Sequence, residues 1–222
     1  MELYYSDYIS DNIPLMEYKD LKQLKVDIPV ESLDISHPTL ECITCYVNEI
    51  KDIKLNTPNL RELNCSINRI EILNLDLPKL EYLNCGYNSI REFNINCPLL
   101  TCLYINNNNL IRFNYSFPEL KNLYCYKNKI IEFNVDSPKL EYIWCENNKI
   151  ELFKCNSSTL KKLCCYDNKI REMYIYSPYM ENLVIYFNTD IKLFIDPNIL
   201  EKLKIYYDYH CLSTGQKLIL NK

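Results

Sequence analysis

Cysteine is the first residue type to consider for chemistry in this chain, because a thiolate can act as a nucleophile, exchange disulfides or bind a metal ion. The chain has 222 residues, and 12 of them are cysteines. Cys42 and Cys45 have the Cys-x-x-Cys spacing that is typical of redox and zinc sites. A larger set recurs at intervals of 20 or 40 residues: Cys45, Cys65, Cys85, Cys125, Cys145 and Cys165. What these thiols can do depends on the elements that hold them.

Other catalytic residue types are scarce or badly placed. The two histidines, His37 and His210, have no obvious partner for a catalytic triad, and no acidic pair recurs where acid–base catalysis would need it. The two glycines are too few for a glycine-rich loop that cradles phosphate or a dinucleotide. We therefore predict that the chain is not an enzyme and binds no cofactor.

A repeat of 20 residues runs through most of the chain and determines where these residues lie. Written as one unit, it reads L-x-x-L-x-C-x-x-N-x-I-x-x-F-x-I-x-x-P-x. The asparagine position shows how strict the period is: Asn48, Asn68, Asn88, Asn108, Asn128, Asn148, Asn168 and Asn188. The proline position keeps the same period with one gap: Pro38, Pro58, Pro78, Pro98, Pro118, Pro138 and Pro178.

This unit resembles the leucine-rich repeat, whose core is L-x-x-L-x-L-x-x-N/C-x-L, with cysteine in place of the third leucine. The match runs from Leu40 to Leu203, after a shortened copy that begins at Leu21. The 20-residue length is similar to that of short repeats in bacterial effectors, and the Cys-x-x-Asn-x-Ile segment is similar to repeat proteins encoded by giant DNA viruses of amoebae. The resemblance implies a solenoid, a right-handed superhelix or horseshoe with a parallel β-sheet on its concave face and little α-helix.

The columns of the repeat also have physical reasons. A segment such as Leu63–Cys65 alternates inward and outward like a short strand, and copies of it should stack in parallel about 4.8 Å apart. The asparagine marks the turn after the strand, where its side chain can bond otherwise unpaired backbone groups. The few residues left for the convex side predict extended or 3₁₀ structure, with a stacked phenylalanine column: Phe93, Phe113, Phe133 and Phe153.

This arrangement argues against thiol chemistry. Residues i and i+3 of a strand point to opposite faces, so Cys42 and Cys45 cannot share a metal ion or a disulfide. A straight ladder of inward thiols does not converge tetrahedrally, so we predict that the repeated cysteines pack in the core and that no metal is bound. Cys42, Cys102 and Cys164 are expected to face outward, where they would be reactive if accessible.

The outward strand positions instead predict a binding surface on the concave face. Aromatic side chains with a polar tip are typical of binding hot spots, because they offer large area with few rotatable bonds. The predicted partner-binding residues gather around the only tryptophan of the chain: Tyr82, Tyr104, Tyr124, Tyr126, Tyr142, Trp144 and Tyr166. The alternative is that these residues only stack on one another and stabilise the sheet, since tyrosine favours strands.

We interpret residues 1–20 as an N-terminal cap, residues 21–205 as the repeats and residues 206–222 as a C-terminal cap. No stretch of 18 apolar residues and no secretory signal pattern is found, which predicts a cytoplasmic protein that is not membrane-bound. The net charge of −4 gives no reason to expect binding to nucleic acid.

The function that these observations favour is a non-catalytic, monomeric scaffold that recognises a protein through its concave face. If the resemblance to virus-encoded repeats holds, the partner is a host or viral protein in the infected cytoplasm. Two alternatives remain: binding of a glycan or small ligand on the same aromatic face, and a purely structural role in self-assembly through an end strand. Stacking of single-stranded nucleic acid is disfavoured, because the central tyrosines have no basic neighbours among them.

Overall fold

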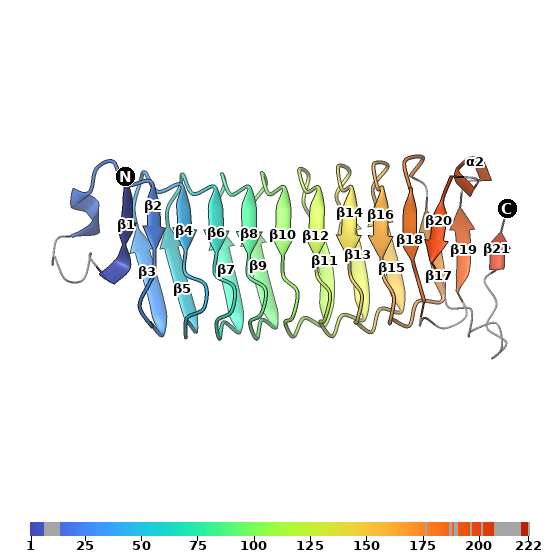
Figure 1. The fold of residues 1–222 in the computed structure, drawn as a ribbon, viewed down its shortest axis with the longest axis horizontal. Helices are drawn as coiled ribbons and strands as arrows, with labels where there is room; N and C mark the ends of the chain where they lie inside the picture. Colours follow the sequence, from blue (N-terminus) through green and yellow to red (C-terminus); the bar gives the residue numbers. More distant parts are fainter. Residues whose placement is uncertain are drawn as a thin grey trace. The chain divides into compact units, whose positions relative to one another are not determined.

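The computed structural model describes residues 1–6, 14–175, 177–186, 188, 191–195, 197–200, 202–206 and 219–221 of the chain. They belong to two units, Met1–Asn109 (unit 1) and Leu110–Lys222 (unit 2). Each unit is a stack of turns, with short strands along one side and long strands along the other (Figure 1). In the described part of the chain, helix occurs only as single turns such as η1 (Leu15–Glu17) and α2 (Pro197–Leu200). Within the described residues, none of the helices has the length and apolar character needed to span a membrane.

Most turns contribute one three-residue strand to the short-strand sheet. In unit 1 the order is β1 (Glu2–Tyr4), β2 (Gln23–Lys25), β4 (Cys42–Thr44), β6 (Glu62–Asn64), β8 (Tyr82–Asn84) and β10 (Cys102–Tyr104). In unit 2 it is β12 (Asn122–Tyr124), β14 (Tyr142–Trp144), β16 (Lys162–Cys164), β18 (Asn182–Val184) and β20 (Lys204–Tyr206). Neighbouring strands of a unit run parallel, and corresponding residues of the repeat are paired, as Leu63 is with Leu83.

The opposite side of each turn is a longer strand, which confirms the predicted extended structure. In unit 1, β3 (Ser32–Ser36) pairs with β5 (Asp52–Asn56), and β7 (Ile72–Asp76) pairs with β9 (Glu92–Asn96). In unit 2 the strands are β11 (Arg112–Ser116), β13 (Glu132–Asp136) and β15 (Leu152–Asn156), then β17 (Glu172–Ile175), β19 (Lys192–Ile195) and β21 (Ile219–Asn221). A 20-residue repeat leaves too few residues here for a helix of useful length.

The core lies between the two layers of strands and is built from the repeat columns. In six turns the inward leucine or isoleucine of the short strand and the cysteine two residues after it are fully buried, as Leu63 and Cys65 are. On the long-strand side the phenylalanine rings stack from turn to turn. Ring centroids are 5.7 Å apart for Phe113 and Phe133, and 4.9 Å apart for Phe133 and Phe153. No single turn could bury these side chains alone, so stacking of turns creates the core.

The asparagine column links adjacent turns, as predicted. The Nδ2 of Asn68 donates to the carbonyl oxygens of Cys45, Cys65 and Ser66 at 2.9, 3.1 and 3.1 Å, and its Oδ1 accepts from the amide of Ile50 at 2.9 Å. These backbone groups belong to consecutive turns of the stack. The asparagine therefore satisfies polar groups that the short strands leave unpaired.

In seven turns the residue before the column asparagine adopts a left-handed backbone conformation, which the sequence pattern did not reveal. Its φ lies between 52° and 57°, at Val47, Ile67, Tyr87, Asn107, Lys127, Asn147 and Asp167. This conformation is favourable for glycine, asparagine and aspartate, and unfavourable for β-branched residues. The turn geometry is thus set by the stack rather than by local propensity.

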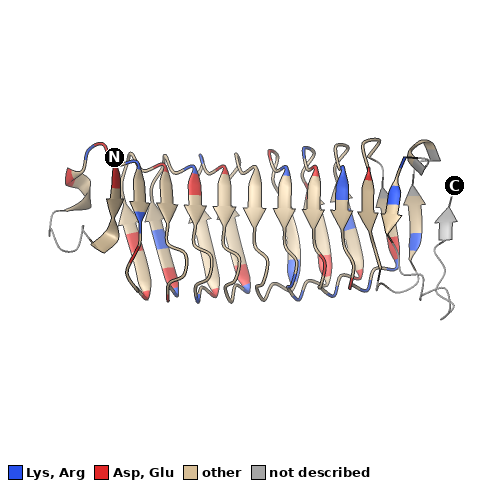
Figure 2. Ribbon diagram, in the orientation of Figure 1, with Lys and Arg blue, Asp and Glu red and all other residues tan. Residues whose placement is uncertain are grey.

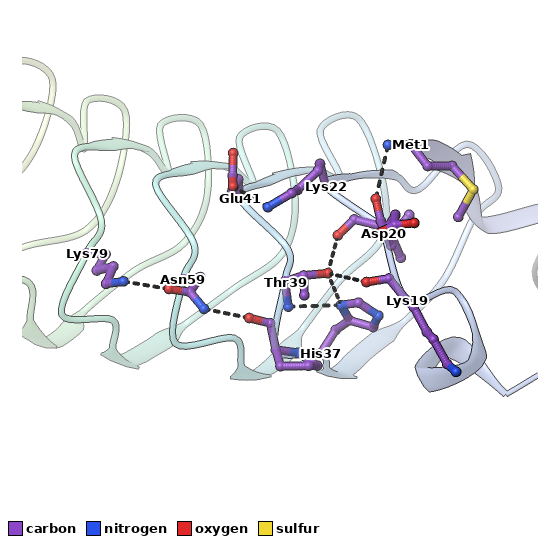
Figure 3. A network of polar contacts seen from close by, with 11 residues as sticks. Met1, Lys19, Asp20, Lys22, His37, Thr39, Glu41, Asn59 and Lys79 are labelled. Carbon is purple, nitrogen blue, oxygen red and sulfur yellow. Dashed lines mark hydrogen bonds and ion pairs between the residues drawn. The ribbon is translucent and has the colours of Figure 1, made fainter.

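The sheet begins within the segment interpreted as an N-terminal cap, because β1 is its outermost described strand and pairs with β2. Residues 7–13 of that segment, and most of the expected C-terminal cap at 206–222, lie outside the described residues. Polar contacts tie this end together: the N-terminal amine of Met1 donates to the carbonyl of Asp20 at 3.0 Å, and the hydroxyl of Thr39 donates to the carbonyl of Leu21 at 2.7 Å (Figure 3).

Candidate functional site

The candidate site lies on the outer face of the short-strand sheet. In β14, Ile143 is buried in the core while Tyr142 and Trp144 point to the opposite face and are half-buried. Charged residues lie on the long strands, in the turns and at the ends of the short strands (Figure 2). The charged residues of the short strands are Glu2, Lys25, Glu62, Lys162 and Lys204.

The centre of the site in unit 2 is a stack formed by β12, β14 and β16. The rings of Tyr124 and Trp144 are nearly parallel, at 7°, with centroids 4.4 Å apart, because the two residues are paired in register. Tyr142 lies beside Trp144 with a centroid distance of 5.9 Å. From β16, the Nζ of Lys162 lies over the Trp144 ring, 5.5 Å from its centroid. Geometry of this kind allows a cation–π interaction, which orders the lysine against the ring.

A second aromatic pair in unit 2 includes a residue that the predicted site omitted. Tyr166 stacks on Tyr186 with a centroid distance of 4.6 Å and an angle of 15°. The 20-residue period placed Tyr186 in the same column as Tyr126 and Tyr166, so the repeat contained the signal. Tyr126 is half-buried on the same side of its turn.

Two of the predicted site residues belong to unit 1. Tyr82 and Tyr104 lie on the neighbouring strands β8 and β10, with ring centroids 5.8 Å apart and a tilt of 50°. The other five lie in unit 2. The predicted set therefore divides into a tilted pair in unit 1 and a more extensive, closely stacked group in unit 2, which is the stronger candidate surface.

Stacking between turns determines what the unit 2 rings offer to a ligand. Because the rings lie parallel to one another at about the spacing of the strands, their faces point along the stack and their edges point outward. The Trp144 ring contacts Tyr124 of one neighbouring strand and the Nζ of Lys162 of the other neighbouring strand. A sugar or a nucleobase stacks on an open ring face, so this arrangement disfavours the glycan and single-strand alternatives.

Glu146 is an acidic group of this face that the sequence analysis did not single out. Its Oε2 is buried without a hydrogen-bond partner from the described residues, and burial raises the pKa of its carboxyl group. The thiol of Cys164 interacts with this carboxylate. Lys162 and Lys127 oppose the effect of burial on the pKa by favouring the charged form of Glu146.

The outward cysteines do not have the properties of reactive thiols. Cys164 does not meet the condition of accessibility on which its expected reactivity depended: it is only 8% exposed, because it packs beside Glu146 between Trp144 and Val184 of the adjoining strands. Burial raises its pKa to about 12. Burial also raises the pKa of Cys42 and Cys102, which are half-buried. These thiols are therefore protonated at neutral pH and poor nucleophiles.

The repeated cysteines pack in the core, as predicted. Cys125, Cys145 and Cys165 are completely buried in unit 2, and burial raises the pKa of each thiol well above its usual value. Among the residues that the structure describes, no group of three or more histidine, cysteine or acidic side chains could hold a metal ion. The core thiols thus act as small apolar groups.

The stacked parallel strands, the asparagine ladder and the 20-residue turns define a leucine-rich-repeat solenoid. A solved structure with this fold is that of YopM from Yersinia enterocolitica WA-314, which matches with a TM-score of 0.72 and 23% sequence identity. The match covers 85% of this chain and 46% of that chain, so this chain spans about half the length of that structure. It confirms the predicted fold and, at the level of the fold, the resemblance to bacterial effectors. No family model and no curated protein sequence matches the chain.

Proposed function

We propose that the chain is a non-catalytic protein-binding scaffold that recognises its partner through the outer face of the unit 2 short-strand sheet. Protein binding in general is consistent with the leucine-rich-repeat fold. The observation that supports this surface as the binding site is the stack of Tyr124, Trp144 and Lys162. Side chains that are already ordered lose little conformational entropy on binding, and their exposed edges and hydroxyl groups suit a polar protein surface.

The cytoplasm is the compartment that we propose for this activity, and a host or viral protein is the partner class. The first proposal is supported by the cysteine content, since thiols persist unpaired in a reducing compartment, and the described cysteines are free. The second is supported by the similarity of the Cys-x-x-Asn-x-Ile segment to virus-encoded repeats.

The test uses two aromatic stacks of nearly identical geometry on opposite sides of unit 2. Tyr174 and Phe194, on the long strands, have ring centroids 4.4 Å apart at an angle of 5°, which matches Tyr124 and Trp144. Proteins captured by the wild-type chain from candidate cell lysates are purified and titrated against Tyr124→Ala and Tyr174→Ala. We expect Tyr124→Ala to raise the Kd at least about tenfold, as a hot-spot residue would, and Tyr174→Ala to leave it unchanged.

The single tryptophan provides a direct readout in the same experiment. Since Trp144 is the only tryptophan in the chain, a tryptophan-free partner that covers this face should change the intrinsic fluorescence on binding. Equal loss of affinity in both variants would show that stacking supports only the fold. Unchanged affinity in both, with unchanged Trp144 fluorescence, would place the binding surface elsewhere.

A further inference from the structure

The left-handed turn position differs in character between the two units, although its geometry is the same. In unit 2 the position holds Lys127, Asn147 and Asp167. In unit 1 it holds Val47, Ile67 and Tyr87 in three successive turns, and Asn107 in the next turn. Asparagine and aspartate tolerate a positive φ, whereas valine and isoleucine strongly disfavour it. Unit 1 thus places apolar side chains where local stability would favour polar ones.

These apolar side chains form a continuous exposed row. Val47, Ile67 and Tyr87 are 61%, 48% and 54% exposed, and the neighbouring Tyr46 is 52% exposed. Their turns are adjacent, because the amide of Asn48 donates to the carbonyl of Ile67 and the amide of Asn68 donates to that of Tyr87. We call Tyr46, Val47, Ile67 and Tyr87 the turn row. An exposed apolar row in a strained conformation works against both solubility and local stability, which points to a binding role.

A pocket of about 470 Å³ opens at the Tyr46 end of the turn row. Its walls include Tyr4, Ile28 and Pro29 together with Tyr46 and Val47. The two charged residues in its wall already have partners within the chain. Lys25 forms an ion pair with Glu2, and the carboxylate of Asp27 accepts from the amide and the hydroxyl of Ser6 at 2.9 and 2.6 Å. The pocket therefore suits a neutral, apolar side chain rather than a charged ligand.

We propose that the turn row and this pocket bind an amphipathic helix of a protein partner, at a site separate from the aromatic face of unit 2. The spacing favours a helix over a strand. Adjacent turns are about 4.8 Å apart, so Val47 to Tyr87 covers about 10 Å. The apolar stripe of a helix recurs every 3.5 residues, or about 5.3 Å, whereas same-face residues of a strand are about 6.7 Å apart. Two intervals of a helical stripe therefore match the Val47–Tyr87 distance within about 1 Å, whereas two intervals of a strand exceed it by about 4 Å.

The size of the row favours a helical segment over a second copy of the chain. About half of each of the four side chains is exposed, which amounts to an apolar patch on the order of 400 Å². A specific interface between two folded copies needs about 800 Å² from each partner. Three or four anchor side chains of a single helix would cover the row, with one of them entering the pocket.

The test selects peptides that bind the wild-type chain and compares them with a variant in which two apolar side chains of the turn row are replaced and the turn conformation is kept. A phage-displayed library of random 16-residue peptides is panned against the wild-type chain and counter-selected against the double variant Val47→Asn/Ile67→Asn. Asparagine occupies this position in unit 2 at Asn147, so the variant retains a residue that suits the turn. Ile111→Asn is the matched control, because Ile111 is 55% exposed and lies outside the row.

We expect the selected peptides to have apolar residues at a period of 3.5 and to become helical on binding, as measured by circular dichroism. Their affinity should fall at least tenfold for the double variant and remain unchanged for Ile111→Asn. The proposal is overturned if panning yields no peptide that discriminates between wild type and double variant, or if the discriminating peptides bind in extended form. It is also overturned if the wild-type chain dimerises and the double variant does not, since the occupant would then be a second copy.

Discussion

Asn168 is 7% exposed between two turns of unit 2, and its single side chain serves four backbone groups. Its Nδ2 donates to the carbonyls of Cys145, Cys165 and Tyr166 at 3.1, 3.1 and 3.2 Å, and its Oδ1 accepts from the amide of Ile150 at 2.9 Å. Removing the side-chain amide would leave the buried amide of Ile150 unsatisfied, which costs about 1–3 kcal/mol. It would also take one donor from each of the three carbonyls, which keep a second donor from Asn148, Asn188 or the amide of Asn147.

We therefore expect Asn168→Ala to lower the free energy of unfolding by about 3 kcal/mol, measured by urea denaturation. Asn156→Ala is the control in the same unit, because Asn156 is exposed and donates to Asp136 at the surface. Its substitution should cost about 0.5 kcal/mol or less. Similar losses in both variants would contradict the structural role assigned to the buried asparagines.

His37 is the other residue whose environment makes a sharp prediction, because it is 1% exposed. Its Nδ1 accepts from the amide of Thr39 at 3.3 Å, while its Nε2 has no partner at hydrogen-bond geometry among the described residues (Figure 3). Burial lowers the pKa of His37 below its ordinary value of 6.5, although nearby carbonyls of Tyr18 and Leu15 partly oppose the shift. The folded chain thus favours the neutral imidazole more than the unfolded chain does.

The sign of the pH dependence follows from this shift. Below pH 6.5 the unfolded chain binds a proton at His37 that the folded chain resists, so stability falls as the pH drops from 6.5 through the lowered pKa. His37→Leu should remove this component, since Leu77 occupies the equivalent position 40 residues later and is buried. Denaturant midpoints measured between pH 7 and pH 5 test this, and parallel pH profiles for wild type and variant would contradict it.

At the scale of the element, the turn after each short strand combines a strained residue with the asparagine that follows it. Ile67 and Asn147 occupy equivalent positions with the same φ of 55°. A left-handed conformation costs an ordinary residue about 1–2 kcal/mol, and less for asparagine. The backbone accepts this cost in unit 1 because the adjacent turns and Asn68 fix its geometry.

Reciprocal substitutions test this account of the turn. Ile67→Asn should raise the free energy of unfolding by about 1 kcal/mol, and Asn147→Ile should lower it by about the same amount. Chemical denaturation of both variants measures the two changes. If Ile67→Asn is destabilising, the exposed isoleucine contributes packing within the chain and the turn row is part of the fold.

The elements were the most predictable part of this protein, because their signal repeats in every turn. The Leu63, Cys65 and Asn68 positions predicted the strand, the core and the turn, since each residue type suits one environment only. The left-handed φ at Ile67 was not predictable, because isoleucine disfavours it and only the stacked neighbours impose it. Likewise, the repeat period predicted that aromatic residues would gather around Trp144 on the outward face. It did not predict the burial of Cys164 and of the Glu146 carboxylate, because that depends on side-chain packing across three strands. A binding role for the face stays a prediction.

At the scale of the whole molecule, the contacts that link one turn to the next are local. Exposed ion pairs join residues about 20 positions apart, as in Lys51–Glu31, Arg69–Glu49 and Lys139–Glu119. Each such pair contributes little to stability, with a typical value below about 1 kcal/mol. The core packing and the asparagine bonds also connect neighbouring turns. A solenoid of this kind has a stability that is approximately a sum over adjacent turns.

Because the contacts are local, we expect that a destabilising substitution in one unit unfolds that unit at a temperature at which the other unit is still folded. Leu63 in unit 1 and Leu163 in unit 2 are equivalent, fully buried core residues, and Leu→Ala at such a site costs about 2–5 kcal/mol. In Leu63→Ala we expect circular dichroism to show an early loss of strand signal, while the fluorescence of Trp144 in unit 2 changes only at a higher temperature. In Leu163→Ala the Trp144 transition itself should move down, by about 10 °C for a loss of about 3 kcal/mol. Equal shifts of the Trp144 transition in the two variants would mean that cooperativity extends through the whole chain, because a local sum over turns cannot transmit the loss from Leu63 to Trp144.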